Sequence, residues 1–312
     1  EQWLGIGTGY SVSDKLGIGA TLFGIYRGQT YQRTNYVREV NYIDPYYVYA
    51  TETIDEAVKY TTIGLLAKAG LSYMSGRWKY GLTITTPSLG LYGSGSIQRE
   101  NSNIVVSENA ADMKDNFMIM DSKSDIKAKY KHPLSIAFGI DFKSAKTRLV
   151  ASAEYFTRIN IYHRFEPASE PFVYPTSYLD SASLKPLIDS YLHVENASRP
   201  VLNAGIGFSQ LVADQFTLLL GAYTDFSSYD KPPEADELLH ASGSWNIYHF
   251  SAGMSYHRKK HTVTLGLSYA LTPSEHIPPY TIINQTPEGE ALLSARSYSI
   301  VLGYTYYFAR AE

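Results

Sequence analysis

The feature that most constrains the fold of this chain is an alternation of apolar and polar residues with a period of two. This period puts apolar side chains on one face of a β-strand and polar side chains on the other. The region 125–164 predicts two strands of about 20 residues, joined by a tight turn at Ser144-Ala145, which is long for a soluble sheet. The apolar register of its first strand reads Ile126, Ala128, Tyr130, His132, Leu134, Ile136, Phe138, Ile140 and Phe142.

The same hairpin pattern recurs along the chain and is followed by one last strand, so the sequence predicts eleven strands. Besides the pair in 125–164, they are 3–12, 16–28, 61–73, 78–86, 201–209, 215–225, 248–257, 262–272 and 298–308. Short turns alternate with long connections at 29–57, 88–122, 167–198, 228–244 and 273–294. Outer-membrane barrels have short periplasmic turns and long extracellular loops, whereas a soluble sandwich or propeller would not sort its loops by length. We therefore predict an all-β fold: a transmembrane antiparallel up-and-down β-barrel of a bacterial outer membrane, with 1–312 as one domain.

Composition agrees with this prediction and excludes several other classes. The 28 Tyr and 23 Gly suit a barrel with aromatic girdles at both membrane interfaces. The absence of Cys excludes disulfides, thiolate nucleophiles and Cys metal sites. A net charge of −3 and a pI near 6.3 argue against a nucleic-acid partner. The sequence contains neither a nucleophile elbow nor a metal motif, so we expect no enzyme activity, no catalytic residue, no metal and no cofactor.

The order of turns and loops also predicts strands upstream of Glu1. The first and the last predicted strands both run from the extracellular side to the periplasm. Bacterial barrels have an even number of strands and two periplasmic termini, so an odd number of strands is expected before Glu1. One such strand would make a barrel of 12 and three would make a barrel of 14. A signal peptide is expected to have been removed or to lie further upstream.

Several segments resemble the FadL-type family of long-chain fatty-acid transporters of the outer membrane. The resemblance covers essentially all 312 residues. Its segments are Leu4 to Gly7, Asp14 to Gly19, Gly81 to Ser88 with its Thr-Pro-Ser, His132 to Gly139, and the hairpin from Asn203 to Asp225. It implies 14 strands and an N-terminal hatch inside the barrel, so the hatch and the first strands are expected upstream. The family's hatch and its Asn-Pro-Ala-type motif are not in this chain, and no ligand-binding residue is carried over from that region.

The predicted interior register consists largely of small residues. Such side chains do not fill a wide barrel, so water, a plug or a ligand is expected to do so. Alternatively, glycine relieves twist and crowding in a curved wall. The glycines are Gly5, Gly7, Gly9, Gly17, Gly19, Gly64, Gly81, Gly139, Gly205, Gly207, Gly221, Gly253, Gly266 and Gly303.

Charged residues of the 125–164 hairpin also face the predicted interior. The tight turn places Asp141 opposite Arg148, and Asp125 opposite Arg164. Arg148 and Arg158 are candidate substrate-binding residues, because a guanidinium can hold an anionic head group such as a carboxylate. The alternative is an internal ladder of ion pairs, or the anchoring of an acidic plug, with nothing bound.

The long connection 167–198 contains a short predicted helix with an apolar stripe. Ser183 can cap this helix, and Pro186 lies in its first turn. The resemblance implies a shallow hydrophobic capture groove in the extracellular loops, which makes this stripe a candidate substrate-binding surface. The alternative is a loop helix that packs on its neighbours. The candidate residues are Leu187, Ile188, Tyr191 and Leu192.

Two functions follow from the resemblance. The first is passive outer-membrane transport of hydrophobic small molecules such as long-chain fatty acids. The second is a docking, shuttle or accessory subunit of an outer-membrane export or assembly complex. The expected partners are membrane lipids, a hydrophobic small-molecule ligand and other outer-membrane or periplasmic proteins, without nucleic acid. Residues predicted to face lipid are Phe138, Ile140, Leu202, Ile206, Leu218, Leu220, Phe250, Met254, Leu265, Leu267, Ile300 and Leu302.

Overall fold

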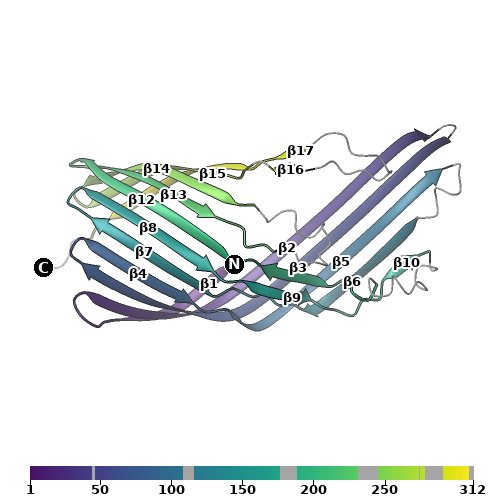
Figure 1. Ribbon diagram of the computed structural model, residues 1–312, viewed down its shortest axis with the longest axis horizontal. Coiled ribbons are helices and arrows are strands. Elements are labelled where there is room, and N and C mark those ends of the chain that lie inside the picture. The colour runs from purple at the N-terminus through teal and green to yellow at the C-terminus, as the bar shows by residue number, and fades with distance from the viewer. Residues whose placement is uncertain are drawn as a thin grey trace.

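The computed structural model describes residues 1–43, 46–107, 116–175, 188–230, 245–273, 275–277 and 291–308. They form antiparallel strands of a curved sheet, with two small two-stranded sheets beside it (Figure 1). None of these residues belongs to a helix long and apolar enough to cross a membrane. The strands are β1 (Gln2–Ser11), β2 (Leu16–Ile43), β3 (Tyr46–Ser75), β4 (Trp78–Thr85), β5 (Leu89–Ser107), β6 (Phe117–Lys127), β7 (Ser135–Lys143), β8 (Thr147–Phe156), β9 (Ile159–Phe165), β10 (Phe172–Tyr174), β11 (Val194–Ser198), β12 (Val201–Ala213), β13 (Phe216–Asp225), β14 (Ile247–Arg258), β15 (His261–Leu271), β16 (Glu275–Ile277), β17 (Ala291–Leu293) and β18 (Arg296–Tyr306).

Eleven strands form the wall, and each pairs antiparallel with its neighbours in the order β1-β2-β3-β4-β7-β8-β12-β13-β14-β15-β18. Their short turns gather at one end of the molecule, on the left in Figure 1. This confirms the predicted fold class and the eleven wall strands. Among the described residues, β1 pairs with β2 and β18 pairs with β15, so this sheet is not closed. The complete count of 14 strands stays a prediction.

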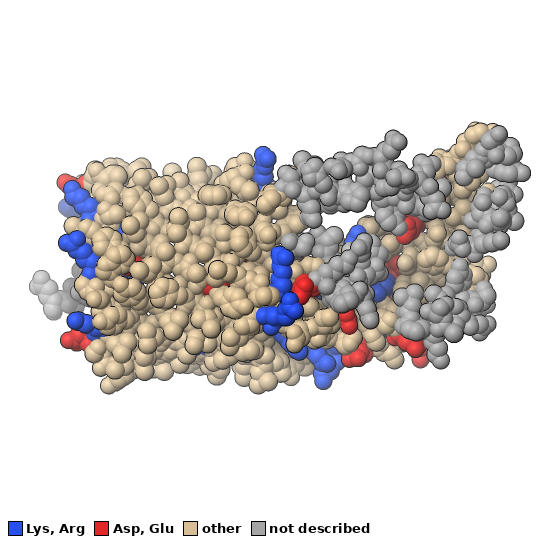
Figure 2. All heavy atoms as spheres, viewed as in Figure 1, with Lys and Arg blue, Asp and Glu red and all other residues tan. Residues whose placement is uncertain are grey.

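The pairing register confirms which residues face outward. All twelve residues predicted to face lipid share the outer register, and Ile206, for example, pairs with Ala151 and Ala222 of the same face. The opposite register carries the small residues, as in the pairs Gly139↔Ser152 and Gly207↔Gly221. Figure 2 shows the resulting band, almost free of charged side chains, bounded by Lys and Arg at the end that carries the short turns. An apolar band of this kind is the surface that a barrel presents to lipid.

The prediction that 29–57 is a loop is wrong. β2 and β3 have 28 and 30 residues and stay paired from Leu16↔Tyr73 to Ile43↔Tyr46. The connection predicted at 88–122 is also mostly sheet, because β5 pairs along β3 and β6 pairs along β5. These strands continue beyond the wall, on the right in Figure 1. In water neither face of a strand must be apolar, so the alternation disappears although the segment remains rich in Tyr, Thr and Val.

The two long strands predicted in 125–164 are each interrupted. The first becomes β6 and β7, separated by 128–134, and the second becomes β8 and β9, separated by 157–158. The neighbouring strand is interrupted at 86–88, between β4 and β5, which both pair along β3. Pro87 and Pro133 lie in two of these breaks, and proline donates no hydrogen bond to a sheet.

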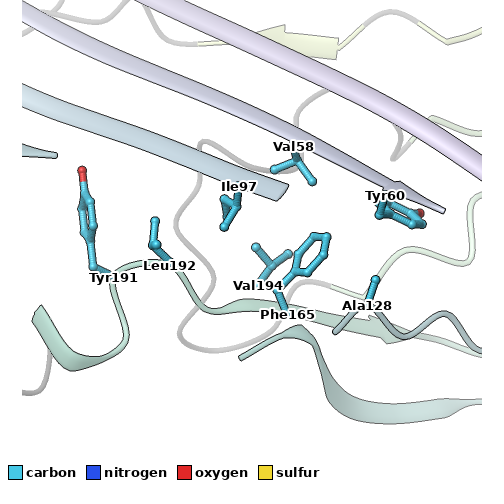
Figure 3. Close-up of a cluster of buried hydrophobic side chains, with 8 residues drawn as sticks. All are labelled: Val58, Tyr60, Ile97, Ala128, Phe165, Tyr191, Leu192 and Val194. Carbon is cyan, nitrogen blue, oxygen red and sulfur yellow. The ribbon is translucent and has the colours of Figure 1, made fainter. Parts of the chain in front are cut away.

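A compact core lies on the inner side of the extracellular half. It consists of Val58, Tyr60, Ile97, Ala128, Phe165, Tyr191, Leu192 and Val194 (Figure 3). Phe165 is 1% exposed, and its ring meets that of Tyr60 edge-on with centroids 5.9 Å apart. Gly95 makes room for this ring, because an added Cβ would lie 2.7 Å from Phe165 Cε1. Through this core, β9, β11 and residues 188–193 pack against the inner face of β3 and β5.

Candidate functional site: a side opening and an inner cavity

The three breaks in the wall lie side by side and surround a cavity of about 650 Å³, here called the side opening. The backbone N–H of His132 donates to Ser88 Oγ over 2.9 Å, and Thr157 N–H donates to the Leu134 carbonyl over 2.9 Å. These bonds tie each break to the next. Because the sheet ladder is interrupted across three neighbouring segments at one level, the wall has a local gap there.

The lining of the side opening comes from both faces of the wall. Ile25 and Thr62 belong to the inner register of β2 and β3 and are almost fully buried. Ile63 and Tyr92 are paired on the outer face and are 42% and 59% exposed. The side opening is thus bounded by side chains of both the inward and the outward register.

A β-bulge lies at the edge of the side opening. Ile63 pairs with Tyr92 and Gly64 pairs with Gly90, which leaves Leu91 as an extra residue in β5. A Cβ on Gly64 would lie 2.9 Å from the Leu89 carbonyl oxygen, so this close approach needs glycine. Bulges bend a strand and are frequent beside functional sites. The bulge lies at the residues of β3 and β5 that border the side opening.

An inner cavity of about 410 Å³ lies on the interior side, lined by β2, β3, β11, Tyr130, Arg164 and the segment after β13. Arg27 organises one wall of it. Its Nε donates to Tyr60 Oη over 3.2 Å and its Nη2 donates to Gln29 Oε1 over 3.2 Å. Its Nη1 forms an ion pair of 2.8 Å with Glu1 Oε2. These contacts hold the guanidinium in one orientation.

Tyr130 lines both the side opening and the inner cavity. The guanidinium carbon of Arg27 lies 3.9 Å from the centre of its ring, and that of Arg164 lies 5.6 Å away. Such cation–π contacts are strengthened by desolvation. Tyr130 is therefore the residue between the two spaces, held by two cations.

Of the two arginines that line the inner cavity, Arg164 has unused hydrogen-bonding capacity. Its guanidinium carbon lies 5.2 Å from the ring centre of Tyr60. Its Nε is buried and has no hydrogen-bond partner among the described residues. A buried donor without a partner is costly, and an anionic ligand would offset that cost. Burial raises the pKa of the nearby Tyr229 hydroxyl to about 12, with a further contribution from the charge of Asp230, so this phenol adds no negative charge at neutral pH.

The structure separates the predicted site residues. Arg148 lies near the start of β8, whereas Arg158 lies in the break that follows β8. Arg148 forms the predicted pair with Asp141 through two hydrogen bonds of 3.0 and 2.8 Å, although Asp141 is cross-strand from Val150 and not from Arg148. Arg158 lines the side opening and lies 3.9 Å from Asp230. The predicted placement of Asp125 opposite Arg164 is wrong, because β6 pairs with β5 and β9 pairs with β11.

The apolar stripe of the 167–198 connection is only partly an accessible surface. Tyr191 and Leu192 are 6% and 0% exposed within the core, so the expectation that they form an open groove is wrong. Tyr191 is held further by a hydrogen bond from its hydroxyl to the Ile119 carbonyl and by one from Arg99 Nη1 to its own carbonyl. Ile188 is half-buried, and Leu187 lies outside the described residues. A substrate-binding role for these four residues stays a prediction.

Sequence reasoning did not select Arg27, Tyr60, Tyr130 or Arg164 as one site. One signal was available, because Arg27 is the first charged residue in the inner register of β2. The residues before it in that register are uncharged: Gly17, Gly19, Thr21, Phe23 and Ile25. The other three residues come from β3, from the break after β6 and from β9. Only the folded wall brings them together.

This combination of wall, side opening and inner cavity defines the class of outer-membrane β-barrels with a cavity in the interior. Among solved structures, the fold is similar to the CymD monoaromatic hydrocarbon channel, with a TM-score of 0.54 and 11% identity over 98% of this chain and 72% of that one. Looser likenesses are the toluene transporter TodX of Pseudomonas putida (TM-score 0.43, 11% identity, 97% of this chain and 82% of that one) and a FadL homologue of Pseudomonas aeruginosa (0.42, 11%, 97% and 78%). The likeness to CymD confirms the predicted barrel fold, and this fold with its apolar outer band is what an outer-membrane location requires. No protein-family model matches the chain, and no curated protein matches it by sequence.

Proposed function

We propose that this barrel carries hydrophobic small molecules passively across the outer membrane. A molecule enters from the extracellular side into the inner cavity, passes Tyr130 and leaves sideways through the side opening into the bilayer. The observation that carries the proposal is the lining of the side opening by residues from both faces of the wall. Transfer of an apolar molecule from water to hydrocarbon is favourable by roughly 25 cal/mol per Å² of buried apolar surface, so no energy source is required.

The similarity of fold supports the same direction. CymD is described as a monoaromatic hydrocarbon channel and TodX as a toluene transporter. A sideways exit suits such molecules because it delivers them to lipid without passage through the aqueous periplasm. Fold similarity does not select a substrate, whereas the charge and apolar surface of the inner cavity restrict the substrate class.

The inner cavity supports an amphiphilic acid, such as a long-chain fatty acid, as the finer proposal. The buried Nε of Arg164 offers a charged hydrogen bond to a carboxylate, while Val58 and Tyr31 supply apolar surface in the same cavity. Hydrogen bonds to charged groups contribute roughly 1.5–3 kcal/mol. A carboxylate at Arg164 would leave the acyl chain to extend toward Tyr130 and the side opening.

The route can be tested by plugging it. The chain contains no cysteine, so Asn160→Cys places a unique thiol at an exposed residue of the side opening. In liposomes, modification of this thiol with a bulky methanethiosulfonate reagent is expected to reduce uptake of a fluorescent fatty acid at least tenfold. The control is Gln98→Cys, an exposed position on β5 away from the opening, whose modification is expected to change uptake by less than twofold. Unchanged uptake after complete labelling of Asn160→Cys would rule out the sideways exit.

The substrate class is tested separately with Arg164→Gln. Loss of the charged hydrogen bond is expected to weaken fatty-acid binding by about 10- to 100-fold. Binding of uncharged toluene is expected to stay within twofold. Arg148→Gln removes the same charge from a guanidinium outside both cavities and should leave fatty-acid binding unaltered. Equal effects of Arg164→Gln on both ligands, or a larger effect of Arg148→Gln, would contradict the assignment of a carboxylate to Arg164.

One observation favours the docking alternative as a second candidate. The extension of β2 and β3 beyond the wall exposes aromatic residues near its tip, with Tyr42 59% and Tyr47 69% exposed and their rings 5.0 Å apart. Exposed apolar groups gathered in one place are typical of protein interaction surfaces. A Tyr42→Ser and Tyr47→Ser variant that loses a co-purifying protein while keeping fatty-acid uptake would support docking as an additional role.

A further inference from the structure

The side opening has a one-sided distribution of charge. Four cations line it, and none of its described lining residues is an aspartate or a glutamate. The four are exposed: Lys127, Lys129, Lys131 and Arg158. The apolar part of the lining accounts for the passage of a hydrophobic molecule, whereas the cations require a separate explanation. We refer to Lys127, Lys129 and Lys131 as the outer lysines.

The pairing of β6 with β5 turns Lys127 outward. Lys127 is the cross-strand partner of Ser94. Ser94 is two residues from Tyr92 in β5, and Tyr92 is paired with Ile63 on the outer face. Residues two apart in a strand lie on the same face, as do cross-strand partners. Ala128, the next residue, is buried in the inner core, as this alternation requires.

Lys129 and Lys131 follow on the same side as Lys127. Tyr130, which lies between them, lines the inner cavity. His132 comes after them and also points inward, because its Nε2 lies 3.1 Å from Oε2 of Glu1 in the interior. Since the residues that alternate with the outer lysines face the interior, all three ammonium groups lie at the outer mouth of the side opening.

The charge of the outer lysines is not neutralised within the described part of the chain, where no ion pair joins any of them to a carboxylate. Glu166 shares a small cavity with Lys127 and Lys129 but has its contact with His163, at 4.0 Å. Asp125 is exposed two residues before Lys127 and forms no ion pair with it. Like charges held together in this way favour an anionic ligand between them.

The other part of the outer mouth is apolar. Leu91, Tyr92 and Ile161 line the same cavity and are exposed. Figure 2 shows Lys and Arg side chains gathered near β9, where the apolar band ends on the side away from the short turns. That side is extracellular, because short turns face the periplasm. The outer mouth therefore joins apolar surface to positive charge at the level of the outer-leaflet head groups.

We propose that the outer mouth of the side opening binds a phosphorylated glycolipid of the outer leaflet, lipid A. A phosphate lies among the outer lysines, and an acyl chain lies against Leu91 and Tyr92. Charge selects this occupant, since each Lys or Arg near an anionic membrane surface contributes about a fivefold preference. The site does not depend on the passage of a substrate through the opening.

Binding is measured with a fluorophore at the outer mouth. Asn160→Cys, which lines the side opening, is labelled with bimane in the full-length protein in detergent micelles, and lipid A is added. Half of the fluorescence change is expected at a mole fraction at least about fivefold lower for lipid A with both phosphates than for the same lipid without phosphate. A label at Gln98→Cys, exposed on β5 away from the opening, should not respond. Equal responses to the two lipids would overturn the proposal.

The role of the outer lysines is tested with Lys127→Gln, Lys129→Gln and Lys131→Gln together. The preference for the phosphorylated lipid is expected to fall at least about tenfold. The control removes three cations at short turns, with Lys15→Gln, Lys259→Gln and Lys260→Gln, and should keep the preference. The heat-induced gel shift verifies folding of both variants. If both lost the preference equally, net charge would explain it and the site would be wrong.

Two competitors distinguish lipid A from other anions. Inorganic phosphate and oleate are added to the labelled protein with lipid A bound. Neither is expected to displace the lipid at an equal mole fraction, because phosphate has no acyl chain and oleate has a single negative charge. Displacement by inorganic phosphate would assign the outer lysines to a free anion. A lysine-dependent signal with oleate but not with lipid A would assign them to the leaving substrate, and either result would overturn the lipid site.

Discussion

Leu220→Arg is expected to lower the free energy of unfolding of the barrel by about 2–4 kcal/mol, because the guanidinium would lie against hydrocarbon near the middle of the bilayer. Leu220 belongs to the outer register of β13, between Phe208 and Ala252, and is 45% exposed. Its cross-strand neighbours, Phe208 and Ala252, are apolar, so the charge must reach the interface at the expense of local packing. Unfolding in guanidinium chloride from a lipid-bound state measures the change.

The matched control is Leu219→Arg. Leu219 is adjacent in the chain and at the same depth, but its side chain faces the interior, where its cross-strand partners are Ser209 and Gly253. Space beside Gly253 and access to water should keep the cost well below that of Leu220→Arg. Equal costs for the two variants would mean that the wall does not separate lipid from a wet interior as the register indicates.

Phe165→Ala is expected to weaken the packing of β9, β11 and residues 188–193 against β3 and β5. Loss of a buried phenylalanine typically costs about 3–5 kcal/mol, through both lost burial and the cavity that remains. The cost should appear locally, because Phe165 fastens β9 and β11 to β3 and β5 but takes no part in the turns of the wall. Hydrogen exchange of residues 188–198 is expected to accelerate by two or more orders of magnitude, while β13 to β15 remain protected.

Phe172→Ala is the control for this variant, since Phe172 is 58% exposed and lies outside the core. It should change the exchange of 188–198 by less than threefold. If Phe165→Ala left these amides protected, the segment before β11 would be held by contacts other than the core. Its hydrogen bonds from Arg99 and to Ile119 would then be the alternatives to test.

The wall was predictable because the bilayer imposes a simple rule on each of its strands. Hydrocarbon requires apolar side chains on one face, so β13, β14 and β15 lie within one residue of their predicted bounds at each end. Where the strands leave the bilayer the rule ends. The extension of β2 and β3 was therefore missed, although its residues Tyr31, Tyr36 and Val40 favour strands.

Two of the breaks in the wall were signalled locally by proline, but the period-two alternation predicted a continuous strand in 125–142. Pro133 continues the period-two pattern of 125–142 but lacks the N–H that a central strand donates. Pro87, in the Thr-Pro-Ser stretch, lacks the same N–H. Each proline predicts an interruption of its own strand. That the interruptions lie beside each other, and beside the break at 157–158, depends on the pairing of β4 with β7 and β7 with β8.

The sequence by itself determined the barrel class, the eleven wall strands and the face that each presents to lipid, because these depend on the local alternation of side chains in an apolar solvent. Only the tertiary structure decided that Tyr191 and Leu192 are buried, and that Arg27, Tyr130 and Arg164 meet around one cavity. The contacts of Tyr130 with Arg27 and Arg164 join residues more than thirty positions apart in the chain. Their formation depends on where the breaks and the extended hairpin direct the chain, and no period in the sequence encodes a meeting between segments that are not paired in the wall.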